Sequence, residues 1–239
     1  MTSPADSEVD RIRAEYQRRA REIPADFYSL DKPANLFSRH NQERMLLAAL
    51  RGAQLIPLRD RLVLEVGCGT GQWFSMFQAF GVSPERISGI ELDQNRAAVC
   101  RQKFPRADVR EGDACQLPWH DEFFDVVLQS TVFTSLLNPL TKQRVASEML
   151  RVLKSDGCIV WYDFSFNNPS NSQVRGVGRR EIQQLFPNCE LRLSRTTLAP
   201  PLARRLVPWS WLLAQLLEQM KFLNTHYLGI IRKPPKSFI

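Results

Sequence analysis

Residues 62–71 read LVLEVGCGTG and join a short apolar run to three glycines. An apolar run of this length is typical of a buried strand in a parallel sheet. The glycines that follow allow the backbone to turn tightly and to approach a ligand where a Cβ would collide with it. Residues 72–80 then have the spacing of a helix. This order of strand, turn and helix presents unpaired backbone N–H groups to a ligand.

The spacing of the glycines is G-x-G-x-G. It differs from the G-x-G-x-x-G fingerprint of dinucleotide-binding proteins, and the Lys-Ser/Thr pair of a P-loop is missing. Residues 65–71, EVGCGTG, resemble the first motif of class I S-adenosylmethionine (SAM)-dependent methyltransferases, in the small-molecule methyltransferase 11/UbiE-like group. A glycine turn in some other α/β protein is the alternative interpretation.

The resemblance covers residues 45–165 closely and the tail loosely. Residues 148–163, EMLRVLKSDGCIVWYD, are similar to a later family motif in which an acid and RVLKPGG precede a strand. The resemblance implies an α/β fold: a Rossmann-like, doubly wound, mostly parallel seven-stranded sheet with an antiparallel C-terminal hairpin and helices on both faces.

Hydrophobic periodicity and turn signals place the expected elements along the chain. The expected strands are 62–66, 86–91, 107–111, 125–130, 158–164, 190–198 and 225–232. The expected helices are 10–23, 41–51, 72–80, 94–104, 141–153, 180–186 and 202–223. Asn41 is the expected N-cap of its helix, and residues 154–157 are an expected turn.

The resemblance also implies a site for SAM and for its product, S-adenosylhomocysteine. Glu91 ends the second expected strand, twenty residues after Gly71, where an acid can accept both ribose hydroxyls. Asp113 follows the third strand and is expected near the adenine amino group, with a surface carboxylate in a turn as the alternative. The expected cofactor-binding residues are Glu65, Gly67, Cys68, Gly69, Gly71, Glu91, Leu92, Asp113, Ala114, Gln129 and Ser130.

Methyl transfer to a hydroxyl requires removal of a proton. Asp163 and Tyr162 end the fifth expected strand, and His40 precedes the first, so these three are the candidate catalytic residues, with His226 of the last strand as a further histidine. Asp163 as a cap of a loop is the alternative. No His, Asp or Glu cluster has the spacing of metal ligands, so no metal is expected.

The chain divides into four expected parts. They are an N-terminal helical cap at 1–44, a SAM-binding core at 45–198, an inserted helical lid at 199–224, and a last strand and tail at 225–239. The apolar and basic segment 202–223 has three interpretations: a lid over the acceptor pocket, a peripheral membrane contact, or a dimer contact.

Composition narrows the class of protein. The chain has 239 residues and a net charge of +7, which is modest support for an acidic partner. The five cysteines form no C-x-x-C pair, which indicates reduced thiols and a cytoplasmic protein. Neither a signal peptide nor a membrane-spanning run is recognised. The arginines within 10–23 belong either to a solvated helix face or to a contact with an anionic partner.

The expected function is methyl transfer from SAM to a small-molecule, sugar or lipid-linked acceptor, with oxygen as the favoured atom. Residues 129–133 lack the Asn/Asp-Pro-Pro-aromatic tetrad of amino-directed DNA methylases, so DNA is not an expected partner. One alternative is a SAM-binding or regulatory module without turnover. A second, less favoured, is an RNA methyltransferase, motivated by the net charge and the N-terminal arginines. The oligomeric state is left open.

Overall fold

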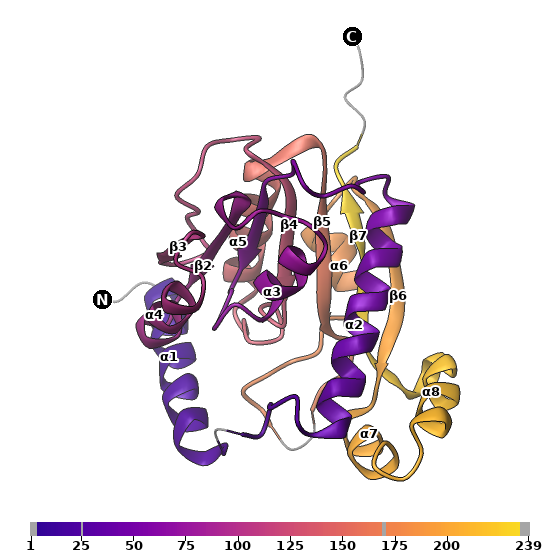
Figure 1. Cartoon of the computed structure of the whole chain (residues 1–239). Coiled ribbons are helices and arrows are strands. Elements are labelled where there is room, and N and C mark those ends of the chain that lie inside the picture. The colour runs from indigo at the N-terminus through magenta and orange to yellow at the C-terminus, as the bar shows by residue number, and fades with distance from the viewer. Residues whose placement is uncertain (1–3, 25, 169–170, 235–239) are drawn as a thin grey trace.

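A computed structural model describes residues 4–24, 26–168 and 171–234, and in these ranges seven strands form one sheet in the order β3-β2-β1-β4-β5-β7-β6 (Figure 1). The strands are β1 Val63–Val66, β2 Ile87–Glu91, β3 Asp108–Glu111, β4 Phe124–Ser130, β5 Leu153–Phe164, β6 Glu190–Leu198 and β7 Asn224–Arg232. The five strands from β3 to β5 are parallel, and β7 runs antiparallel to both β5 and β6. The expected Rossmann-like sheet with an antiparallel C-terminal hairpin is therefore confirmed.

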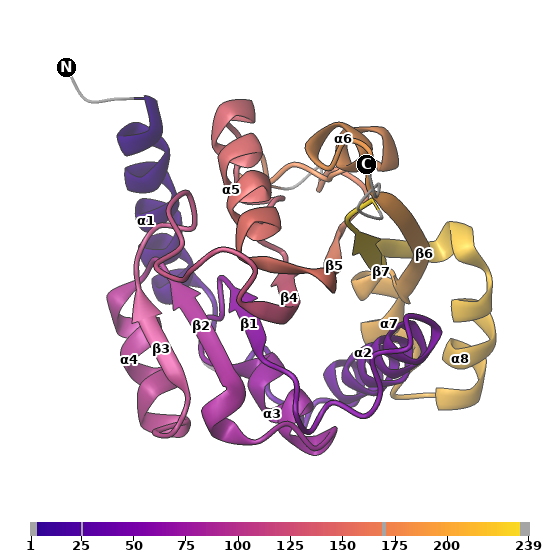
Figure 2. The same cartoon turned by 90° about the horizontal axis from the view of Figure 1, so that it is seen from above.

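Helices cover both faces of the sheet (Figure 2). The α-helices are α1 Pro4–Glu22, α2 Pro33–Gly52, α3 Gln72–Ala79, α4 Gln94–Lys103, α5 Pro139–Val152, α6 Arg179–Leu185, α7 Pro200–Leu206 and α8 Trp211–Gln219, with 3-10 turns η1 Pro84–Arg86 and η2 Lys221–Leu223. One apolar core joins the sheet to α1, α5 and α6, and a second joins it to α2, α3 and α4. None of the helices in the described ranges is long and apolar enough to cross a bilayer.

Alternation along the strands sends neighbouring side chains into different cores. Leu64 and Val66 of β1 enter the core with α5, and Val63 enters the core with α2 and α3. In β5, Trp161 enters the core with α5, and Tyr162 enters the core with α2 and α3. Side chains on the two faces of one strand therefore reach different surroundings, which decides the roles of Tyr162 and its neighbour Asp163.

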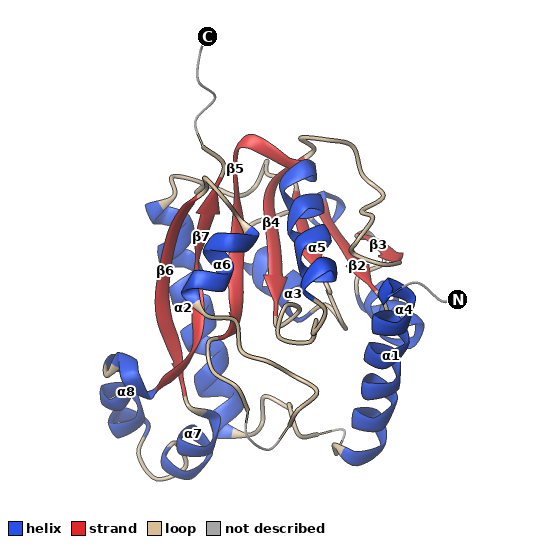
Figure 3. Ribbon diagram, turned by 180° about the vertical axis from the view of Figure 1, so that it is seen from behind, coloured by secondary structure: helices blue, strands red, loops and turns tan. Residues whose placement is uncertain are grey.

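The carboxyl ends of the parallel strands form one edge of the sheet, here called the carboxyl edge. The strand order reverses between β1 and β4, and ligands bind in α/β sheets at the carboxyl ends of strands beside such a reversal. β4 points toward the end of the molecule where α7 and α8 lie (Figure 3).

The prediction that a helix begins at Asn41 was wrong. The helix starts at Pro33 rather than at Asn41, because proline suits the first helical turn, where its missing N–H is not needed. Asn41 is consequently a buried residue inside the helix rather than its cap. The same helix runs through residue 44, the expected end of the N-terminal cap.

Two further segments differ from expectation. The expected helix 202–223 is divided into α7, α8 and η2, because Pro208 cannot continue a helix and Ser210 caps the next one by accepting a hydrogen bond from Leu213 N–H at 3.2 Å. The expected turn at 154–157 lies within β5, whose pairing with β4 shifts register after Phe124. One residue of β4 lies between the pairs Phe124–Leu153 and Val126–Cys158, whereas β5 has residues 154–157 between them.

Candidate active site

The glycine turn after β1 is held directly against β2. Gly67, Gly69 and Gly71 have φ values of +69°, +57° and +82°, in the left-handed region that favours glycine. The N–H groups of Gly67 and Cys68 both donate to the carbonyl oxygen of Ile90, at 2.9 and 3.0 Å. A Cβ at Gly67 would lie 2.5 Å from a methyl carbon of Val132, so the turn also packs closely on the segment after β4.

Glu91 lies at the centre of this arrangement. Its Oε2 accepts a hydrogen bond from Gly69 N–H at 2.7 Å, and its Oε1 accepts one from Asp93 N–H at 3.0 Å. Asp93 itself caps α4 by accepting from Arg96 N–H. The structure therefore brings together the glycine turn and the acid that the sequence paired with it, and it gives Asp93 the capping role.

Arg96 is a residue of this site that the sequence analysis missed. A Cβ placed on Gly69 would lie 2.5 Å from Arg96 Nη2, so the guanidinium lies over the glycine turn. The same guanidinium lies 4.6 Å from the centre of the Tyr16 ring of α1 and 4.0 Å from Glu91 Oε2. Its position in the first turn of the helix after β2 was an available signal, but the contact with α1 required the folded structure.

Two buried polar atoms beside the turn have no hydrogen-bond partner among the described residues. They are Glu65 Oε2 and Gln129 Nε2. Burial raises the pKa of Glu65 well above its ordinary range, and the Oε1 of Gln129 accepts from Val132 N–H at 3.2 Å. Unpartnered buried groups are costly, so these atoms suit polar groups of a ligand such as the amino-acid end of SAM.

The remaining expected cofactor residues lie along the same edge. Gly112 N–H donates to Glu91 O at 3.0 Å, which places the end of β3 next to the end of β2. Asp113 follows and accepts from Cys115 N–H at 2.9 Å, so its carboxylate closes a turn. Leu92, Ala114 and Ser130 are half-buried. Their contacts with a cofactor, and that of Asp113, stay predictions.

Asp163 is fully buried on the face of β5 that α5 covers. Its carboxylate accepts hydrogen bonds from the Thr134 hydroxyl, from Thr134 N–H at 3.2 Å and from Phe164 N–H at 2.8 Å. Burial raises the pKa of Asp163 to about 6, against these hydrogen bonds. The two bonds from Thr134 hold the loop after β4, which favours the loop-capping alternative, while a catalytic role of Asp163 stays a prediction.

Tyr162 points to the opposite face, toward α2 and α3. Its hydroxyl accepts from Gln42 Nε2 at 2.9 Å and shares a 2.9 Å hydrogen bond with Thr197 Oγ1. Burial raises the pKa of Tyr162 to about 12, so the phenol is protonated at neutral pH. Thr197 has a φ of +65°, which is strained for a β-branched residue and aims its hydroxyl at Tyr162.

His226 of β7 lies against this phenol. The two rings are stacked, with centres 4.7 Å apart and planes 12° apart, and the Phe164 ring centre lies 3.8 Å from that of the imidazole. Burial lowers the pKa of His226 to about 3, so the imidazole is neutral at physiological pH. His40, in contrast, is exposed on α2 and lies beside Trp211 of α8, with ring centres 5.8 Å apart. The structure thus groups Tyr162 with His226 and leaves His40 outside that group.

Helix α1 lies across the carboxyl edge. Glu8 accepts hydrogen bonds from Leu137 and Asn138 N–H, and Arg11 donates to the carbonyl oxygens of Ser135 and Gln173. Burial acts to raise the pKa of Glu8, but its hydrogen bonds outweigh burial and the pKa is lowered. Because Tyr16 of the same helix contacts Arg96, α1 covers the glycine turn and is not merely a solvated helix.

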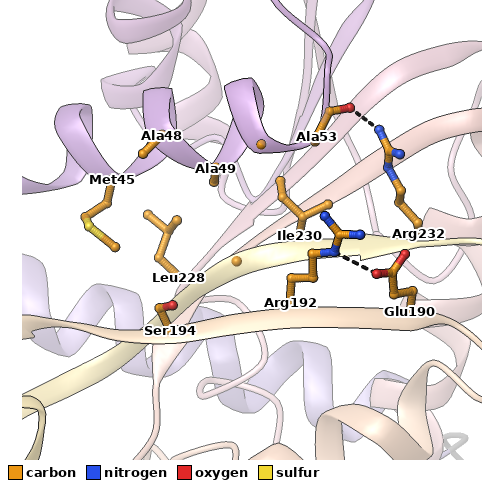
Figure 4. A pocket seen from close by; sticks show the side chains of 12 residues that line it. Met45, Ala48, Ala49, Ala53, Glu190, Arg192, Ser194, Leu228, Ile230 and Arg232 are labelled. Carbon is orange, nitrogen blue, oxygen red and sulfur yellow. Dashed lines mark hydrogen bonds and ion pairs between the residues drawn. The ribbon is translucent and has the colours of Figure 1, made fainter.

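A separate groove of about 260 Å³ lies between α2 and the β6–β7 hairpin (Figure 4). Leu228, Ile230 and Ala49 form its apolar part, and Arg192 and Glu190 form an ion pair at its border. Leu228 and Ile230 pair with Tyr162 and Val160 of β5, and the residues that line the groove do not include the glycine turn. Within 4–24, 26–168 and 171–234, no three His, Cys, Asp or Glu side chains are grouped to hold a metal, and the absence of a metal stays a prediction.

Comparison with known proteins identifies the part of the chain that carries the glycine turn. A family model described as a methyltransferase domain matches residues 64–161. These residues form a class I methyltransferase domain. SAM is the methyl donor of this class. The matched range runs from β1 through most of β5, so it includes the glycine turn, Glu91 and Asp113.

The methyltransferase domain has relatives named for quinone biosynthesis. The demethylmenaquinone methyltransferase of Listeria welshimeri is 34% identical over 131 residues, which are 52% of this chain and 54% of that protein. The ubiquinone/menaquinone biosynthesis C-methyltransferase UbiE of Campylobacter jejuni is 27% identical over 122 residues, 49% of this chain and 51% of that protein. The chain therefore spans about half the length of the curated relatives it matches.

Solved structures share the fold beyond the matched domain. Phosphoethanolamine N-methyltransferase 1 of Haemonchus contortus, in complex with phosphoethanolamine and S-adenosylhomocysteine, has a TM-score of 0.67 and 13% identity. The match covers 100% of this chain and 51% of that one. At this identity the likeness shows the fold alone, and the acceptor has to be argued from this chain's own residues.

Proposed function

We propose that the chain is a SAM-dependent methyltransferase that acts on oxygen of a small hydroxylated aromatic compound, free or linked to a lipid. The SAM-binding part of the proposal rests on the 2.7 Å hydrogen bond from Gly69 N–H to Glu91 Oε2. It joins a glycine turn to an acid at the end of β2, as a ribose-binding site requires. The unpartnered Glu65 and Gln129 atoms beside the turn support the same assignment.

The aromatic nature of the acceptor is inferred from the side chains beside the ends of β4 and β5. Trp73, Tyr162, Phe164 and His226 meet there, and flat rings stack on flat rings at low cost. Burial keeps His226 neutral, and with its Nδ1–H donating to the Thr225 hydroxyl 3.0 Å away, its Nε2 can accept a hydrogen bond from an acceptor hydroxyl. Tyr162 stays protonated and positions its neighbours rather than serving as a base at neutral pH.

The residues of the chain would bind, orient and shield the reactants. SAM bound at this site would supply a methyl group carried on a sulfonium sulfur. Helix α1 excludes water from the glycine turn through Tyr16, and Asp163 holds the loop after β4 in place. Such positioning supplies much of the rate enhancement in a displacement of this kind.

Carbon is the second candidate for the methylated atom, because the matched relatives carry the names of quinone methyltransferases, one of them a C-methyltransferase. A phenolate shares its charge between oxygen and ring carbons, so the same acceptor class serves both outcomes. Mass spectrometry and NMR of the product separate them, since a methoxy group and a ring methyl group give different signals.

Isothermal titration with SAM and S-adenosylhomocysteine tests whether the chain binds the methyl donor and its product. The variant Glu91→Gln loses a charged acceptor, so we expect its affinity to fall by roughly 10-fold to 100-fold. Glu85→Gln is the matched control, because Glu85 is exposed and pairs with Arg106 on the surface. If the folded wild-type protein binds neither compound, the proposal fails.

Turnover separates an enzyme from a SAM-binding module. We expect labelled SAM to be converted to S-adenosylhomocysteine when hydroxylated aromatic compounds or a bacterial lipid extract is added. Binding without conversion on any acceptor would favour the regulatory alternative.

The RNA alternative is weakened by the pairing of the α1 arginines. Arg11 pairs with Glu8 at 3.0 Å, and Arg18 pairs with Glu15 at 2.7 Å and with Glu22. These pairs reduce the positive charge available on the helix. Salt-sensitive binding of bulk tRNA would restore this alternative, since phosphate contacts release counterions.

A further inference from the structure

The α7–α8 region exposes large apolar side chains on one side of the molecule. Trp209 is 90% exposed, Phe222 is 72% exposed and Leu212 is 67% exposed. Leu216 and Met220 are exposed as well, one and two helical turns beyond Leu212. This set is here called the apolar face. Monomeric soluble proteins rarely expose contiguous apolar groups on this scale without an interaction partner.

Helix α8 turns apolar side chains outward and its acid inward, unlike an ordinary surface helix. Its acid, Glu218, faces inward, where it accepts hydrogen bonds from the Asn41 side chain and from Leu198 N–H at 3.4 Å. Ala214, one turn earlier, is fully buried against α2 and α7. The leucines of α8 that carry the exposed surface therefore point outward while its one carboxylate points inward, the reverse of the usual arrangement in water.

The charges around the apolar face have one sign. Arg204, Arg205 and Lys221 are exposed beside it, and Glu218 is the one acid between residues 200 and 223. None of the three basic residues pairs with a carboxylate in the part of the chain that the structure describes. Arg204 lies over the Phe27 ring and Lys221 donates to Arg195 O, two contacts that add no negative charge.

We propose that α7, α8 and η2 form a docking surface for a bilayer that contains anionic phospholipid. Trp and Leu side chains enter the interface between headgroups and acyl chains, while flanking Arg and Lys contact lipid phosphates. A second copy of the chain fits less well, because a symmetric contact through this face would place Arg204, Arg205 and Lys221 near their own copies.

Docking in this way orients the candidate site. The apolar face lies at the end of the molecule to which β4 points, so the carboxyl edge of the sheet faces the bilayer (Figure 3). A lipid-linked acceptor then reaches the edge without leaving the membrane. This consequence rests on the proposed function, whereas membrane binding itself rests on exposure and charge alone.

Co-sedimentation with vesicles tests the proposal. We expect the wild-type protein to bind vesicles of equal parts phosphatidylcholine and phosphatidylglycerol and to bind pure phosphatidylcholine far more weakly. Trp209→Ser should lower the affinity by at least about tenfold, because a large side chain no longer enters the interface. Arg205→Gln should lower it about fivefold, and added salt should do the same.

Ile56→Ser is the matched control, because Ile56 is 36% exposed and precedes β1, at the edge of the sheet opposite to the carboxyl edge. It should bind vesicles as the wild type does. The proposal is overturned if the wild type fails to bind phosphatidylglycerol vesicles, or if Trp209→Ser binds them unchanged. It is also overturned if light scattering shows a dimer that Trp209→Ser dissociates. Titration of Trp209→Ser with SAM should match the wild type, which separates this test from that of the proposed function.

Discussion

Gly69 combines two requirements in a single residue. Its φ of +57° lies where a side chain costs roughly 1–2 kcal/mol, and its N–H is aimed at Glu91. A Cβ there would also meet the end of the Arg96 side chain, which is flexible and can move aside. The backbone cost is therefore unavoidable, while the collision can be relieved by moving a guanidinium that belongs to the site.

The variant Gly69→Ala should consequently lose both stability and cofactor affinity. We expect a loss of about 1 kcal/mol in the free energy of unfolding from the backbone alone. We also expect at least about tenfold weaker SAM binding, because the turn and Arg96 shift together. Urea denaturation and isothermal titration measure the two effects.

The variant Gly81→Ala separates the effect on stability from the effect on SAM affinity. Gly81 has a φ of +93° and no atom within 4 Å of an added Cβ, and it lies at the far end of α3 from the glycine turn. It should lose a similar amount of stability and keep its SAM affinity. Equal loss of affinity in both variants would show that the turn has no special role in binding.

Asp163 makes the stability depend on pH in an unusual direction. Burial raises its pKa from an ordinary 3.8 to about 6 in the folded chain, so the folded state holds its proton more tightly than the unfolded state. Stability from this group is complete below the unfolded pKa and is lost as the pH rises through the folded pKa. The loss is roughly 3 kcal/mol in size.

The variant Asp163→Asn should remove this dependence. Between about pH 4 and about pH 7, the free energy of unfolding of the wild type relative to the variant should fall by roughly 3 kcal/mol. Urea titrations at several pH values measure it. Asp156→Asn, at an exposed position in the same strand, should leave the curve parallel to that of the wild type. Parallel curves for Asp163→Asn would contradict the raised pKa.

At the scale of elements, α1 acts as a cover held by a few polar contacts. Glu8 binds the loop after β4, and Arg11 binds that loop and Gln173. We expect Glu8→Gln to weaken these charge-assisted hydrogen bonds and to raise the rate of SAM dissociation by roughly tenfold. Stopped-flow displacement of SAM by an excess of S-adenosylhomocysteine measures that rate.

Glu22→Gln is the control within the same helix. Glu22 is largely exposed and pairs with Arg18 on the solvent side. Its removal should leave the dissociation rate unchanged, because exposed ion pairs contribute little. If both variants release SAM at the wild-type rate, α1 does not control access to the glycine turn.

The strands were predictable because local patterns determine them. The run 62–66 and the alternation at 190–198 both match observed strands, and the mostly parallel sheet with its antiparallel hairpin follows from the family resemblance. Glu91 beside Gly69 was predictable for the same reason, since each lies at the end of a strand or the start of a turn. Thr197 and Arg96 were not, because their roles depend on contacts with Tyr162 and Tyr16, which are distant in sequence.

Helix boundaries were less predictable than strands. Asn41 is a good cap in isolation, but in the folded chain it is bonded to Glu218 and Thr196, so tertiary contacts override the local preference. The pattern of 202–223 indicated one helix, and the break at Pro208 was visible in the sequence but outweighed by the apolar spacing. Asp163 and Tyr162 were expected together, yet adjacent residues of a strand point to opposite faces.

Across the whole molecule, the sheet joins the parallel strands beside the glycine turn to the antiparallel pair β6 and β7. Gly229 lies in the middle of β7, and a Cβ there would collide with the carbonyl oxygen of Arg192 in β6. Backbone cannot move aside as a flexible side chain can. We expect Gly229→Ala to lose about 2 kcal/mol or more of stability, as overpacked sites do.

Hydrogen exchange shows which strands the Gly229→Ala substitution destabilises. Amide protection should fall first in β6 and β7. β1 and β2 should keep their protection if the parallel strands unfold as a separate cooperative unit. Gly178→Ala is the control, since no atom lies within 4 Å of an added Cβ. Uniform loss of protection would show instead that the sheet opens as one unit.

The position of β7 between β5 and β6 also constrains how the chain is made. β6 leaves the ribosome before the strand that will pair with it, and α7 and α8 must follow before β7 exists. During that interval β6 is a strand with two open edges, a hazard that its charged Arg192 and Arg195 reduce. The order of synthesis therefore makes β6 and β7 the last strands to assemble, and the interval before β7 is when a chaperone would matter most.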